Sequence, residues 1–77
     1  MIKTGMLWLD DNSRHPFSAK VERAIAYYKE KYGRYPNVCY IHPSCMPKAL
    51  SLERPIDIRT AKDVLPHHFL LGITHPT

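Results

Sequence analysis

Glycine is scarce in this chain of 77 residues, which contains only three. Loops that wrap phosphate groups need closely spaced glycines, because the backbone must approach the phosphate closely. No Gly-x-Gly-x-x-Gly or Walker sequence occurs. The chain therefore lacks the common nucleotide-binding loops.

Cysteine is also scarce, and the two cysteines do not form a Cys-x-x-Cys pair. Zinc ribbons and fingers use two paired sets of ligands. Cys39, His42 and Cys45 are weak metal candidates, because Cys39 and His42 point to opposite faces of an extended strand. A Cys39–Cys45 disulfide is a second alternative. We favour Cys39 as a small buried apolar residue and expect no metal or other cofactor.

Long apolar stretches are missing too. No segment approaches the ~20 apolar residues that span a bilayer, and the first residues lack the small-residue cleavage site of a secretory signal. We therefore expect a cytoplasmic protein with reduced cysteines and no membrane partner.

The features that are present predict one small α/β (α+β) domain over residues 1–77. Apolar residues recur at helical spacing over about 16–32, ahead of Gly33 and Pro36. Apolar runs predict strands over about 5–10, 37–42, 56–60 and 68–74, with a loop over 43–55. The order is β-α-β-β-β, a two-layer sandwich of one main helix on a small mixed four-stranded sheet. The first β-α-β unit should be parallel, and the last two strands should form an antiparallel hairpin.

The first and last strands are apolar on both faces, at 6–9 and 69–71. One helix covers one face of a sheet, and a large bare apolar face is typical of an interaction surface. Two explanations are open. Met46, Leu50 and Leu52 of the loop fold over the second face, or a homodimer or protein partner covers it. We favour the partner.

Two aspartates, Asp10 and Asp11, end the first strand, and His42 ends the second. Parallel strands bring such residues to one edge of the sheet. Paired carboxylates hold Mg²⁺ in phosphoryl-transfer sites, whereas Asp-Asp-Asn-Ser is also ordinary turn and cap sequence. A metal-dependent nuclease or phosphotransferase that uses these three residues is the enzymatic alternative.

A basic and aromatic group surrounds the end of the predicted helix in a chain of formal net charge +4. Tyrosines interleaved with cations stack on bases and bind phosphates. The outward-facing members form a candidate nucleic-acid or anion-binding surface: Arg23, Tyr27, Lys31, Arg34 and Tyr35.

The sequence thus favours a small non-enzymatic binding or adapter module. We expect it to act as a homodimer or by docking on a protein partner over the helix-free face of the sheet, with nucleic acid as a further partner at the basic helix end.

Overall fold

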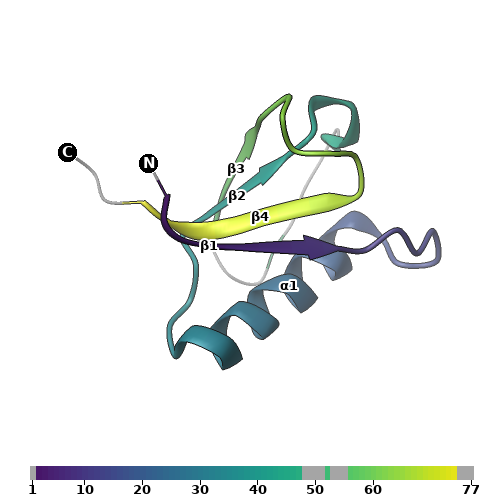
Figure 1. Ribbon diagram of the computed structural model, residues 1–77. Coiled ribbons are helices and arrows are strands. Elements are labelled where there is room, and N and C mark those ends of the chain that lie inside the picture. Colours follow the sequence, from purple (N-terminus) through teal and green to yellow (C-terminus); the bar gives the residue numbers. More distant parts are fainter. Residues whose placement is uncertain (1, 48–51, 53–55, 75–77) are drawn as a thin grey trace.

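The computed structural model describes residues 2–47, 52 and 56–74, and these form one helix on a four-stranded sheet (Figure 1). The elements follow in the order β1 (Ile2–Leu9), α1 (Phe17–Tyr32), β2 (Val38–Ile41), the short 3-10 helix η1 (Pro43–Cys45), β3 (Asp57–Thr60) and β4 (His68–Thr74). The predicted fold class, a small α+β sandwich with a mixed sheet, is confirmed.

The strand order in the sheet is β1-β4-β2-β3. β4 runs antiparallel to both β1 and β2, so β1 and β2 point the same way, and β3 pairs with β2 in parallel. The predicted antiparallel hairpin of the last two strands is wrong. β3 lies at one edge, and the chain then crosses the sheet so that β4 fills the space between the two parallel strands.

The helix forms as its apolar spacing predicts, with Val21, Ala24, Ile25 and Tyr28 buried. It ends at Gly33, whose φ of 76° is left-handed and favours glycine. The Gly33 amide donates to the Lys29 carbonyl at 2.8 Å, and the Lys29 ammonium donates to the Gly33 carbonyl at 3.1 Å. These contacts satisfy backbone groups that a helix end leaves free.

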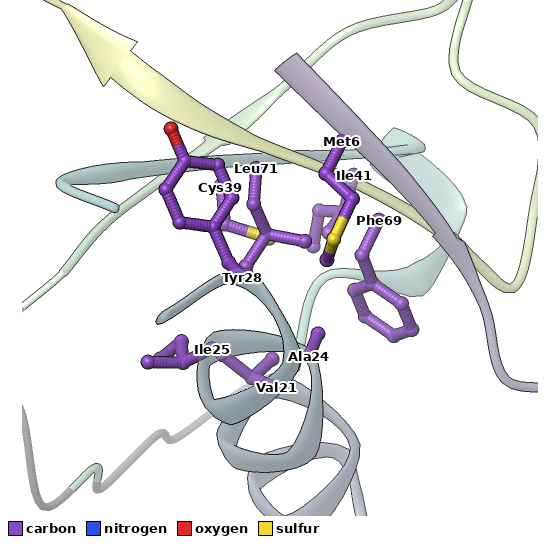
Figure 2. Packing of buried hydrophobic residues seen from close by; sticks show 9 residues of the cluster. All are labelled: Met6, Val21, Ala24, Ile25, Tyr28, Cys39, Ile41, Phe69 and Leu71. Carbon is purple, nitrogen blue, oxygen red and sulfur yellow. The ribbon is translucent and has the colours of Figure 1, made fainter. Parts of the chain in front are cut away.

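The core lies between α1 and the sheet (Figure 2). Each strand contributes alternate residues to this layer, because successive side chains point to opposite faces. The sheet supplies Met6, Cys39, Ile41, Phe69 and Leu71, and each is buried. The helix therefore covers one face of the sheet, as Figure 1 also shows.

Candidate functional site

The face of the sheet away from α1 carries exposed leucines. Leu7 and Leu9 of β1 are 62% and 55% exposed, and Leu65, in the β3–β4 connection, is 64% exposed. Half-buried Leu70 lies opposite Leu7 in the β1–β4 register. We call these four leucines the apolar patch. A shallow hollow of about 320 Å³ lies among three of them, and its lining residues are Leu7, Asp63, Val64, Leu65, His68 and Leu70.

The β3–β4 connection shapes one side of this patch. Its Ala61 amide donates to the Ile41 carbonyl at 2.8 Å, and the Val64 amide donates to the Ala61 carbonyl at 3.2 Å. Val64 is thereby buried, whereas Leu65 stays outside. The connection covers part of the second face and leaves an apolar rim.

A tight turn returns the chain from this connection into β4. The His68 amide donates to the Leu65 carbonyl at 3.1 Å, Pro66 takes the second position, and His67 takes the third with φ 66°. These features define a type II turn, whose third position normally holds glycine or asparagine. His67 is the one non-glycine residue with positive φ in the described chain.

The alternative in which the 43–55 loop covers the second face is not found in the part of the loop that the structure describes. Met46 remains 47% exposed. Leu52 packs against the core on the helix side of the sheet, and Leu50 lies outside the described residues. Val64 of the β3–β4 connection lies over part of the second face, a position that its sequence did not predict.

Asp10 and His42 lie at the same edge of the sheet, as predicted, but β4 separates their strands. Strands are spaced about 4.8 Å apart, which puts the two strand ends roughly 10 Å from each other. Asp11 is exposed beside Asp10. The structure instead brings Asp10 to His15, a residue that the sequence reading had not singled out, with 3.5 Å between carboxylate oxygen and Nδ1.

The environment of Asp10 favours its ionised form. Partial burial alone raises its pKa, but the Asn12 amide, which donates to Oδ1 at 3.1 Å, lowers it, as do His15 and the charge of Lys20. The resulting pKa is below the usual value for an aspartate. These contacts are those of a carboxylate that organises a turn.

His42 acts as the cap of η1. Its Nδ1 accepts the Ser44 amide at 3.0 Å and lies 2.7 Å from the Ser44 hydroxyl. Cys39 faces the core, where burial raises the pKa of its thiol to about 12. Cys45 is half-buried, and both cysteines are free thiols. In the described part of the chain no group of three His, Cys, Asp or Glu side chains is placed to hold a metal ion.

The five residues predicted to bind nucleic acid are all exposed. Tyr27 packs on Trp8, with 4.6 Å between ring centroids, and stays 56% exposed. Arg23 and Lys31 lie one helical turn to either side of Tyr27. The Arg23 guanidinium is 3.3 Å from the His15 ring nitrogens, and the Lys31 ammonium is 5.4 Å from the Tyr32 ring centre.

Arg34 and Tyr35 follow the end of the helix. Tyr35 is 41% exposed, and the Lys29 ammonium lies 5.5 Å from its ring centre. Trp8, which the sequence reading placed only in a strand, joins this surface through Tyr27, and its buried Nε1 has no hydrogen-bond partner among the described residues.

Comparison with protein-family models, with curated proteins and with solved structures gave no match for this chain. α1, which is the longest helix in the described residues, is too short and too polar to cross a bilayer.

Proposed function

We propose that this chain is a protein-binding module that works through the apolar patch, and that its first partner is a second copy of itself. The observation that carries the proposal is the exposure of Leu7, Leu9 and Leu65 on one side of the sheet. Contiguous apolar surfaces of this kind on small proteins are typical of binding sites.

Covering these leucines supplies a free energy comparable to the cost of association. Full burial of a leucine contributes about 1.5–3 kcal/mol, so covering the exposed part of each is worth roughly 1–2 kcal/mol. Three leucines on each of two copies give roughly 6–12 kcal/mol, against about 4–15 kcal/mol for lost translation and rotation. We therefore expect a dissociation constant in the micromolar range or weaker.

Charge around the patch suits a symmetric contact. Asp63 lines the hollow, and Lys62 precedes it in the β3–β4 connection. A two-fold contact places the same surface on both sides, so both signs of charge are available to each copy.

The test is the molar mass of the chain across a concentration series, measured by light scattering. We expect a rise from one chain of 9.0 kDa towards two, and a shift of this rise to at least tenfold higher concentration in Leu7→Ser. Met46→Ser is the matched control, because Met46 is exposed but outside the patch. A single-chain mass at every concentration would overturn self-association and leave a different protein as the occupant to be sought.

A second function, binding of single-stranded nucleic acid, is favoured by the Trp8–Tyr27 pair between Arg23 and Lys31. An exposed ring offers a base a stacking surface, and the flanking cations lie where the phosphates would pass. The chain has one tryptophan, so quenching of Trp8 fluorescence by an oligonucleotide reports on this site directly.

We expect binding of a single-stranded oligonucleotide to weaken steeply with salt. Lys31→Ala with Arg34→Ala should reduce the log–log salt slope by about 1.4, since each phosphate contact contributes about 0.7. Arg59→Ala with Lys62→Ala removes the same charge elsewhere and is the control. Equal losses in the two double variants would reduce the effect to net charge and contradict a site on α1.

The enzymatic alternative with Asp10, Asp11 and His42 stays a prediction. Its test is Mg²⁺-dependent cleavage of nucleic acid that Asp10→Ala abolishes while the fold is kept.

A further inference from the structure

β1 is an edge strand, because the described strands pair it only with β4. Its register with β4 is interrupted between Ile2 and Gly5 and is regular from Gly5 to Leu9. The regular stretch therefore has five residues, and Leu7 is its centre.

The backbone N–H and C=O groups that point away from β4 in this stretch belong to Gly5, Leu7 and Leu9. The Asp10 amide donates to the His67 carbonyl at 3.0 Å, and these two residues continue the same β1–β4 register. In an antiparallel pair only every second residue bonds to the neighbour. Trp8 and Met6 therefore bond to β4 along with Asp10, and the three residues of odd number point outward.

A side-chain contact agrees with this assignment. The Tyr32 hydroxyl donates to the Gly5 carbonyl at 3.4 Å, so that carbonyl does not face β4. Leu7 and Leu9 thus combine outward backbone groups with largely exposed side chains.

The stretch carries none of the features that usually protect an edge strand. Natural edge strands avoid pairing with other chains through charged residues, prolines or bulges. From Gly5 to Leu9 the sequence is Gly-Met-Leu-Trp-Leu, with no charge and no proline, and the bulge lies before it.

We propose that a second copy of this chain pairs with β1 by antiparallel strand addition about a two-fold axis at Leu7. The inference rests on the proposed self-association and specifies its geometry. Leu7 then lies opposite Leu7 of the other copy, and Leu9 lies opposite Gly5, which has no side chain to obstruct it.

The stretch suits a second copy because it is self-complementary. In a two-fold contact, if residue i lies opposite residue j of the other copy, then j lies opposite i. The three outward positions 5, 7 and 9 all lie opposite one another only when the axis passes through Leu7. All three outward positions are used in this register. It also sets the Leu7 side chains of the two copies side by side on the helix-free face, so that each covers the flank of the other and loses part of its exposure.

Residue-resolved hydrogen exchange tests the pairing. At a concentration where the mass is that of a dimer, we expect the Leu7 and Leu9 amides to exchange at least about tenfold more slowly than in the dilute monomer. The Met6 and Trp8 amides bond to β4 in both states, and they are the internal control.

Two failures are distinguishable. A dimeric mass with unprotected Leu7 and Leu9 amides would overturn strand addition and leave association through the patch. A monomeric mass at all concentrations would overturn the self-association on which the inference rests.

Cross-linking provides an independent readout. Directly opposed residues in a hydrogen-bonded antiparallel pair have Cα atoms about 5.5 Å apart, within the range of a disulfide. In a Cys45→Ser background, Leu7→Cys should form covalent dimers under an added mild oxidant at least tenfold faster than Leu65→Cys. The two leucines are equally exposed, but Leu65 is not on β1. Equal rates would overturn the register.

Discussion

The same strands form both faces of this sheet, but the two faces differ in how far their apolar side chains are buried. Leu71 and Met6 are buried against α1, whereas Leu7, the next residue after Met6, is largely exposed. Both faces carry leucine, so composition does not distinguish them. The difference is that α1 covers one face, whereas the β3–β4 connection covers only part of the other and leaves the patch leucines exposed.

This contrast shows that the pattern of apolar residues along a strand determines how many of its faces need to be covered. A strand that alternates apolar and polar residues needs one cover, whereas β1 is apolar on both sides over Met6–Leu9 and needs two. Among the described residues, α1 provides one of them. The exposed leucines on the other face are the reason that we propose a binding function.

The largest expected difference concerns the two thiols. Cys39 lies under α1 with a pKa of about 12, so at pH 8 only about one Cys39 thiol in ten thousand is ionised. Cys45 is half-buried and outside the core. Iodoacetamide should therefore label Cys45 first and Cys39 only on unfolding, as measured by peptide mass spectrometry, with labelling of both thiols in urea as the control. Fast native labelling of Cys39 would show that the covered face is open.

Alanine substitutions of two leucines compare the faces energetically. Leu71→Ala should lower the free energy of unfolding by about 2–5 kcal/mol, because it leaves a cavity in the core. Leu7→Ala, measured on the dilute monomer, should change it by less than about 0.5 kcal/mol. Urea denaturation measures both, and Ile41→Val is the milder core variant if Leu71→Ala does not fold. Similar losses of unfolding free energy in Leu71→Ala and Leu7→Ala would contradict the difference between the two faces.

The turn beside the helix-free face gives a smaller effect. His67→Gly should raise the free energy of unfolding by up to about 1 kcal/mol, because glycine adopts the observed φ of 66° without the penalty of a side chain. His68→Gly is the matched control and should lower stability, since His68 is in β4. A loss of stability in His67→Gly would mean that the histidine side chain holds the connection in place.

The smallest effect concerns Asp10, at the end of β1. Its pKa is lower in the folded chain, so ionised Asp10 stabilises the fold above the unfolded aspartate pKa of about 3.9. This stability is lost as the pH falls through the lower folded pKa. Asp10→Asn should cost less than about 1 kcal/mol at pH 7, and this cost should become smaller at pH 2. Thermal denaturation at both pH values measures this, and an effect that is independent of pH would contradict it.

Much of the fold was predictable because its signals are local. The helical spacing of apolar residues ahead of Gly33 predicted α1, and apolar runs predicted the strands. The order of the strands depends on pairings between distant residues, such as Leu71 with Cys39. Neither strand encodes that choice, and for this reason the predicted hairpin was wrong.

The sequence predicted an exposed apolar face, but it did not predict which residues lie on it or beside it. Double-sided apolar strands indicated a bare face, but the position of Val64 over that face depends on the path of a connection after β3. Similarly, no spacing rule signalled that Trp8 would meet Tyr27, or Asp10 would meet His15. These contacts arise where separate elements pack together.

The most direct test of the account is the solvent exposure of the patch methyl groups in solution. In methyl NMR with a soluble paramagnetic agent, the relaxation enhancement at Leu7 and Leu9 should fall as the protein concentration rises, while that at Met46 stays constant. Enhancements at Leu7 and Leu9 that stay as large at high concentration as at low would contradict the claim that a second copy packs against these leucines.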